Sequence, residues 1–312
     1  MRPKVGVLLG GRSAEREVSL NSGEAVYQAL VSRGYHAVKI DTAQDPAGRI
    51  KAAEIDVAFL ALHGRWGEDG TIQGLLELLD IPYTGSGVLA SALAMDKVVT
   101  KKILIHEDIP TPVFAVFDVG DVRREGYECV QDRLLHLLSL PVVIKPATEG
   151  STIGISFVHH EKDILAGLKK AFERSPKVLV EKFVKGMEVT ASILGNDEPV
   201  ALPLIEIVSA TGVYDYEAKY TPGMSQHVIP PRLPQKVQTT VKQLALAAYR
   251  AVGCRGLARV DAMVDEYGAA TILEVNTLPG MTATSLYPDA ARAAGIEFPD
   301  LVEKLVELAL KR

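Results

Sequence analysis

A predicted β-hairpin near the C-terminal end of the chain constrains its fold more than any other feature. The runs 258–265 and 272–280 are rich in strand-forming residues, and Glu266-Tyr-Gly268 lies between them. Glycine supplies the positive φ that a tight turn needs, so these residues predict a reversal of the chain. The last third of the protein should therefore contain a pair of antiparallel strands.

The register of this hairpin should bring four polar side chains together. Residues two apart in a strand share a face, and a turn at residues 267–268 sets Asp261 opposite Glu274 and Arg259 opposite Asn276. Carboxylate and amide oxygens suit Mg²⁺ that is bound to substrate phosphates, whereas an ordinary hairpin would show the same groups as a solvated face. Val260, Ala262, Leu273 and Val275 are predicted to form the opposite face of the hairpin, which should be buried.

Composition indicates an ordinary globular protein with room for two or three domains in 312 residues. The net charge of −5 argues against a nucleic-acid partner, because such proteins usually present a basic face. Cys129 and Cys254 show no metal or disulfide spacing, which predicts free thiols in a reducing compartment. No apolar run approaches the ~20 residues of a membrane span, so a cytoplasmic protein is expected.

The first 95 residues alternate between strand-like and helix-like segments. Strands are predicted near 5–9, 36–40 and 56–62, and helices near 17–33 and 71–79. This alternation predicts a parallel sheet with functional loops at the carboxyl ends of its strands. Glu15 and His63 both follow such strand ends. Glu15 could equally interact with a helix dipole, and a lone histidine is more often structural.

The rest of the chain predicts further strands and helices. Strands are expected near 113–116, 141–144, 155–158, 178–180, 188–194 and 200–207, and helices near 95–106, 163–174, 234–252 and 300–311. Residues 209–226 are rich in tyrosine, proline and glycine and indicate a functional loop, because long irregular segments are uncommon in compact domains.

A phosphate-binding loop is predicted between two of these strands. The sequence contains no P-loop, and no dinucleotide fingerprint follows the first strand. The small-residue loop 149–154 could turn backbone N–H groups onto phosphate oxygens, with Lys145 reaching the same phosphates. A plain hairpin loop with an exposed lysine is the alternative. The strand edge 180–184 could contact an adenine or only connect two domains.

Six motifs follow one another along nearly the whole chain. They are 9–19 (LGGRSAEREVS), 62–71 (LHGRWGEDGT), 95–97 (MDK), 145–154 (KPATEGSTIG), 214–220 (YDYEAKY) and 273–282 (LEVNTLPGMT). Together they resemble the D-alanine–D-alanine ligase family of ATP-grasp enzymes. Several ordered motifs of this length make a chance resemblance very improbable.

The resemblance implies an α/β fold with a three-domain ATP-grasp architecture. An N-terminal parallel-sheet substrate domain (1–96) would be followed by two α+β domains that enclose ATP. These are a central domain with a phosphate flap (97–183) and a C-terminal domain with a metal site and mobile loop (184–312).

The resemblance also implies an activity and its partners. ATP would drive the joining of two D-alanines through a D-alanyl phosphate, giving D-alanyl-D-alanine, ADP and phosphate for peptidoglycan precursors. Two Mg²⁺ or Mn²⁺ ions are implied, a monovalent cation is left open, and a homodimer is implied. D-lactate or D-serine as the acceptor is the alternative.

Individual residues receive roles through the same resemblance. The metal ligands would be Asp261, Glu274 and Asn276, with Glu274 bridging two ions. Phosphate, adenine and ribose contacts fall on Lys97, Lys145, Glu181, Lys182, Val184 and Glu188. Lys219 would place a positive charge near the phosphate and the acceptor.

The substrate groups follow in the same way. Glu15 would hold the ammonium of the first D-alanine, with His63 beside it. Ser285 and the Leu286 N–H would bind the carboxylate of the second. Arg259 and the Gly280 N–H would stabilise the oxyanion. Arg259 is thus interpreted as an oxyanion stabiliser rather than as a salt-bridge partner. Tyr220 would close over Ser151 and Glu15 and favour an amine acceptor.

Two other classes of protein fit the sequence poorly. A nicotinamide-dependent dehydrogenase lacks its dinucleotide fingerprint. A non-catalytic binding protein is disfavoured because Glu15, Arg259, Asp261, Glu274 and Asn276 occur together.

Overall fold

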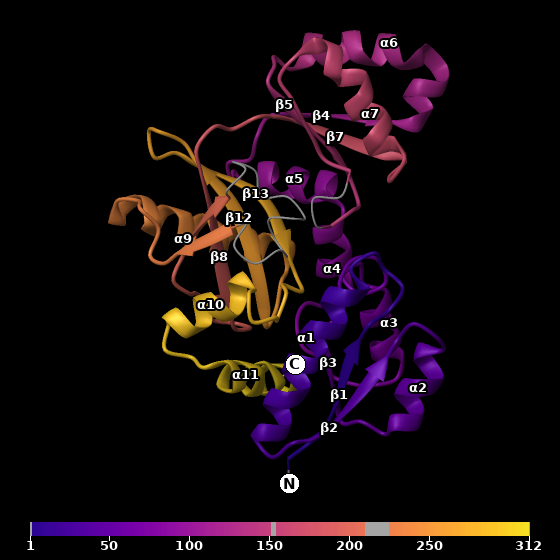
Figure 1. Cartoon of the computed structure of the whole chain (residues 1–312), viewed down its shortest axis with the longest axis vertical. Coiled ribbons are helices and arrows are strands. Elements are labelled where there is room, and N and C mark those ends of the chain that lie inside the picture. Colours follow the sequence, from indigo (N-terminus) through magenta and orange to yellow (C-terminus); the bar gives the residue numbers. More distant parts are fainter. Residues whose placement is uncertain (1, 151–153, 210–224, 312) are drawn as a thin grey trace.

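The computed structural model describes residues 2–150, 154–209 and 225–311, which form three sheets with helices around them (Figure 1). The first is a parallel sheet in the order β2-β1-β3, built from β1 (Lys4–Leu9), β2 (His36–Asp41) and β3 (Val57–Leu60). The predicted parallel sheet is thus confirmed. The carboxyl ends of its strands lie at one edge, and the segments that carry Glu15 and His63 begin there.

Helices from both ends of the chain cover this sheet. They are α1 (Arg16–Ser32), α2 (Pro46–Ala53), α3 (Thr71–Leu78) and α11 (Phe298–Leu310), with α4 (Val88–Met95) leading onward. In α11, Leu301 and Leu305 share a hydrophobic core with Val26 of α1. The C-terminal helix therefore returns to the first sheet, as Figure 1 shows.

The second sheet is antiparallel and carries two helices on one face (Figure 1). Its order is β4-β7-β5-β6, from β4 (Phe114–Asp118), β5 (Val142–Pro146), β6 (Ser156–Val158) and β7 (Lys177–Lys182), with η1 (Glu161–Asp163), α6 (Val119–Leu137) and α7 (Ile164–Phe172). No helix was predicted where α6 lies. It begins with a capping box between Asp118 and Asp121 and is interrupted at Gly126.

The third sheet has the order β11-β10-β8-β12-β13, with β9 beside β8. Its strands are β8 (Met187–Leu194), β9 (Val200–Ala201), β10 (Ile205–Ser209), β11 (Ser225–Val228), β12 (Leu257–Val264) and β13 (Ala270–Asn276). The helices nearby are α5 (Lys97–His106), α9 (Gln235–Val252) and α10 (Leu286–Ala293). The single strand predicted over 200–207 is wrong. It divides at residues 202–204, where Pro203 has no N–H to donate.

The hairpin register at the polar patch is confirmed. Asp261 lies opposite Glu274 and Arg259 opposite Asn276. A β-bulge follows, because the register shifts between Asp261 and Ala262, and Ala262 faces Ile272. The prediction that Leu273 is buried is wrong for this reason: Leu273 is the extra residue and is half-buried, while Ile272 enters the core.

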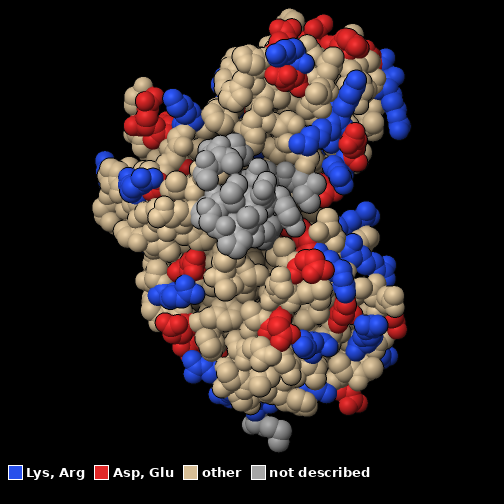
Figure 2. All heavy atoms as spheres, viewed as in Figure 1, with Lys and Arg blue, Asp and Glu red and all other residues tan. Residues whose placement is uncertain are grey.

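Charged side chains of both signs are interspersed over the face in Figure 2. Cys129 is exposed and Cys254 is buried, and both are free thiols as predicted. Within the described residues, no helix combines the length and apolar character that crossing a membrane requires.

Candidate active site

Asp261 lies at the centre of a network of hydrogen bonds in the hairpin patch. Its Oδ1 accepts hydrogen bonds from Thr190 Oγ1 (2.6 Å) and Arg259 Nε (2.9 Å). Its Oδ2 accepts from an Arg259 terminal nitrogen (2.8 Å) and from Asn276 Nδ2 (3.1 Å). Asp261 is only 6% exposed, so the patch is not a solvated hairpin face. Contrary to the interpretation from the sequence, Arg259 is a salt-bridge partner here.

Glu274 lies beside a second cation. Lys97 Nζ is 3.6 Å from Glu274 Oε2 and donates to the Glu149 carbonyl at 2.6 Å. A cavity of about 30 Å³ lies here, with Glu274, Asn276, Lys97 and Gly150 among its walls. The loop 149–154, which the sequence predicts to bind phosphate and which is called the phosphate loop below, therefore begins directly beside the hairpin patch.

The donor set fits Mg²⁺ or Mn²⁺ bound together with a phosphate. Glu274 offers hard carboxylate oxygens, and Asp261 would exchange one of its four hydrogen bonds for the metal. Asn276 donates to Asp261 through Nδ2, which directs its Oδ1 elsewhere. No group of three His, Cys, Asp or Glu side chains suited to a metal occurs among the described residues. Two carboxylates and an amide suffice only if substrate phosphates complete the coordination.

A buried ion triad lies behind the phosphate loop. The Glu181 carboxylate bridges Lys101 and Lys145, and Lys101 Nζ also donates to Thr111 Oγ1 at 2.6 Å. Burial opposes the charge of Lys145, but Glu181 and Glu274 outweigh it and raise the pKa of Lys145. Burial instead lowers the pKa of Lys101. Lys145 is thus a partly buried cation paired with Glu181 and not the exposed lysine of a plain loop.

Glu15 is buried where the first sheet meets the phosphate loop. A Cβ added to Gly64 would lie 2.8 Å from Glu15 Oε2, and one added to Gly150 would lie 3.1 Å from the same atom. Both glycines therefore permit a close approach that a side chain would prevent. Burial lowers the pKa of His63, against the opposing effect of Glu15, and favours a neutral ring.

A chain of contacts joins His63 to the turn after the hairpin. His63 Nε2 lies 3.3 Å from Ser22 Oγ, which accepts the Met281 N–H at 3.3 Å. The neighbouring Gly280 is close to Ser285, since a Cβ at Gly280 would lie 2.8 Å from Ser285 Oγ. Ser285 is at the N-cap position of α10 without a side-chain cap hydrogen bond, so the Leu286 N–H is at a helix N-terminus, a favourable place for a carboxylate.

Comparisons with known proteins identify the family. The family model described as D-ala D-ala ligase N-terminus matches residues 39–86, and the one described as D-ala D-ala ligase C-terminus matches residues 103–307. A D-alanine–D-alanine ligase of Pelotomaculum thermopropionicum is 64% identical over 311 residues, covering 100% of this chain and 98% of its own length. The chain belongs to the D-alanine–D-alanine ligase family.

Solved structures of the family share the whole fold. D-alanine–D-alanine ligase from Bacillus anthracis complexed with ATP is 36% identical with a TM-score of 0.84, and the match covers 99% of this chain and 98% of that one. The VanG D-Ala:D-Ser ligase from Enterococcus faecalis is 30% identical with a TM-score of 0.84, covering 99% and 100%. The predicted ATP-grasp architecture is therefore confirmed for this member of the family.

Several predicted ATP contacts lie along one strand and its continuation. Glu181 and Lys182 end β7, the strand between β4 and β5, so residues 180–182 belong to the second sheet. Lys182 Nζ donates to Ser139 and Leu140, away from the triad. Val184 is half-buried beyond the strand, and Glu188 in β8 contributes to the raised pKa of Lys145. Ser151, Lys219 and Tyr220 lie outside the described residues.

Glu68 belongs to the site although no role was predicted for it. Its Oε2 accepts the Gly64 N–H at 2.6 Å, and the residue lines the same cavity as Lys97 and Glu274. Burial, together with the nearby Glu15, raises the pKa of Glu68 to about 8. Its place in the 62–71 motif is the signal that could have identified it. Lys101, inside an ordinary helix, gave no such signal.

The raised pKa of Glu68 predicts a pH-dependent stability. The folded chain retains a proton that the unfolded chain releases above its ordinary pKa of 4.5, so stability should fall as pH rises from about 4.5 towards 8. Glu68→Gln should flatten that fall. The measurement is urea unfolding of the unliganded protein between pH 5 and 8.5, with the exposed Glu266→Gln as control. Equal pH slopes in Glu68→Gln and the native chain would contradict the assignment.

Proposed function

We propose that this chain joins two D-alanines into D-alanyl-D-alanine at the expense of ATP, through a D-alanyl phosphate. The observation that carries the proposal is the meeting of three segments. Glu15, at the start of α1 after the first strand, lies beside Gly150 of the phosphate loop, while Lys97 links that loop to Glu274 of the hairpin. In this one region Glu15 could bind an ammonium group, the phosphate loop and Lys97 could bind a triphosphate, and Glu274 could bind a metal.

The first step requires a carboxylate to attack an anionic phosphate. Lys97 and Lys145 supply positive charge, which the buried Glu181 holds in place for Lys145. Two Mg²⁺ or Mn²⁺ ions on Asp261, Glu274 and Asn276 would screen the phosphates when bound. Glu15 supplies the negative charge that orients the ammonium of the first D-alanine.

The second step forms the peptide bond. The amine of the second D-alanine attacks the acyl carbon, and phosphate leaves with the bridging oxygen. The Arg259 guanidinium and the Gly280 N–H are suited to stabilise the oxyanion that develops. Ser285 and the N-terminus of α10 suit the carboxylate of the second substrate.

The second candidate function is ligation of D-alanine to a different acceptor, D-serine or D-lactate. The VanG D-Ala:D-Ser ligase shares the fold at 30% identity, whereas ligases named for D-alanine reach 64%. The motif 214–220 also favours an amine acceptor. Product analysis with D-alanine, D-serine and D-lactate supplied together tests this. D-alanyl-D-alanine as the minor product would contradict the proposal.

Tyr220→Phe should raise the use of D-lactate relative to D-alanine. The proposed hydrogen bonds of Tyr220 to Ser151 and Glu15 would be lost, and the closed site would exclude other acceptors less well. The two products are measured over equal times at saturating ATP. Tyr214→Phe in the same segment serves as the matched control. An unchanged product ratio in Tyr220→Phe would contradict the role.

We also propose a cytoplasmic homodimer that serves peptidoglycan synthesis. Leu78 on α3 and Leu89 on α4 are 86% and 72% exposed, with Val88 beside them. Large exposed apolar side chains on packed helices are typical of a subunit interface. Sedimentation of the native chain and of Leu78→Glu would test this surface.

A further inference from the structure

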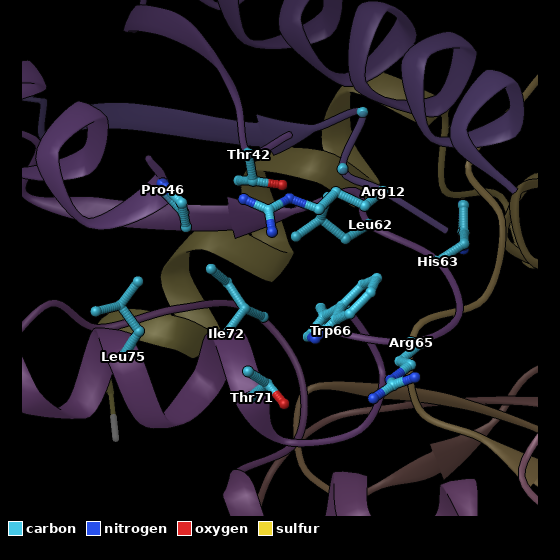
Figure 3. Close-up of a pocket in the computed structure, with 13 residues that line it drawn as sticks. Arg12, Thr42, Pro46, Leu62, His63, Arg65, Trp66, Thr71, Ile72 and Leu75 are labelled. Atoms are coloured by element: carbon cyan, nitrogen blue, oxygen red, sulfur yellow. The ribbon is translucent and has the colours of Figure 1, made fainter. Parts of the chain in front are cut away.

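A cavity of about 140 Å³ lies beside the first sheet, outside the candidate active site (Figure 3). The segments after β1, β2 and β3 contribute to its walls, together with α3. His63 stands at its edge, and the His63 ring is directed away from the space between Arg12 and Trp66. His63 Nε2 lies next to Ser22 Oγ. The side of this histidine that faces the candidate active site is therefore the side turned away from the cavity.

The floor of the cavity is apolar. Leu62 and Ile72 are buried, and Leu75 and Trp66 extend the apolar lining. An apolar cavity of about 150 Å³ is large enough to hold a benzene ring. The size and lining therefore suit one aromatic ring or a branched aliphatic group.

The polar rim carries positive charge. Arg12 Nε donates to the Ala43 carbonyl at 2.5 Å, which fixes this guanidinium at the rim. The Arg65 guanidinium lies 4.7 Å from the centre of the Trp66 ring. Guanidinium groups of this kind favour an anion.

No acidic residue is among the described residues that line the cavity. Three carboxylates on flanking segments are engaged by other groups. Asp41 pairs with Arg16 at 2.7 Å, Asp45 accepts the Gly48 N–H at the start of α2, and Asp69 accepts the N–H groups of Trp66 and Thr71. An ammonium group would therefore find no counter-charge here, in contrast to the Glu15 site.

The Trp66 backbone is strained at this place. Its φ is 67°, a left-handed conformation that is costly for a bulky residue, and its side chain is 41% exposed. Strain of this kind is concentrated at functional sites. The loop thus holds a large aromatic side chain over a charged rim.

We propose that this cavity is a second binding site, for a small aromatic or branched monoanion that lacks an ammonium group. The ring or branch fills the apolar floor, and Arg12 and Arg65 bind the anionic end. D-alanine is not a ligand of this site, because its ammonium would remain unpaired.

Trp66 makes the proposal directly measurable, because it is the only tryptophan of the chain. Benzoate, benzamide and benzamidine share one shape and differ in charge, so they serve as matched probes of Trp66 fluorescence. Benzoate should give a saturable change, with binding at least about tenfold tighter than for the other two, as expected for a charged hydrogen-bonding partner. Equal binding of benzamide or benzamidine would overturn the proposal.

Variants identify the site. Arg12→Gln and Arg65→Gln should each weaken benzoate binding by about tenfold or more, and the exposed Arg123→Gln on α6 should not. Saturating D-alanine should leave the benzoate titration unchanged. Native affinity in both Arg12→Gln and Arg65→Gln, or displacement of benzoate by D-alanine, would refute a separate anion site. Arg65 is exposed, so this variant remains informative if Arg12→Gln fails to fold.

Discussion

Arg259→Ala should lower kcat by about a hundredfold to a thousandfold, the usual effect of removing one oxyanion donor. The KM for ATP should change much less, because Arg259 is proposed to act on charge that exists only as the peptide bond forms. Steady-state kinetics at saturating D-alanine and Mg²⁺ provide the measurement.

The pairing of Arg259 with Asp261 offers a competing explanation for the same loss. If Arg259 served only to hold Asp261, extra Mg²⁺ should restore turnover. Thr190→Val is the matched control, since it removes a 2.6 Å bond to Asp261 without touching the guanidinium. Recovery of Arg259→Ala at high Mg²⁺, with Thr190→Val behaving alike, would exclude the oxyanion role.

Glu181→Gln should destabilise the fold by about 3–5 kcal/mol, the cost of breaking a buried ion pair by removing one partner. Lys101 and Glu181 are each 1% exposed, so water cannot replace the lost carboxylate. The two lysines would also repel each other in the variant. Urea unfolding without nucleotide measures the free energy of unfolding.

Lys182→Ala is the control for this experiment. Lys182 is the next residue in β7, but its Nζ bonds to Ser139 and Leu140 near the surface. Its removal should cost no more than about 1 kcal/mol. If Glu181→Gln were no more destabilising than Lys182→Ala, the triad would not be a structural element of the site.

The polar patch could be predicted because strand geometry is regular. Alternation fixes which side chains share a face, and the glycine turn fixes which residues meet, so the pairing of Asp261 with Glu274 follows. The bulge could not be predicted, because an extra residue leaves no periodic signal. For that reason Ile272 is buried and Leu273, which was predicted to be buried, is only half-buried.

Contacts between segments distant in sequence were beyond prediction. Nothing near Lys101 in the sequence indicates that Glu181 will neutralise it, because their pairing depends on how α5 packs behind β7. The raised pKa of Glu68 likewise arises from burial near Glu15, across two loops. The partners and the burial of such groups can be known only from the three-dimensional structure.

The central claim is ligation of two D-alanines through an acyl phosphate, and oxygen transfer tests it most directly. D-alanine labelled with ¹⁸O in both carboxylate oxygens is incubated with ATP, Mg²⁺ and the native chain. The proposal predicts D-alanyl-D-alanine and one ¹⁸O in each phosphate, because the bridging oxygen leaves the acyl carbon. Unlabelled phosphate, or ADP formed without the dipeptide, would contradict the account.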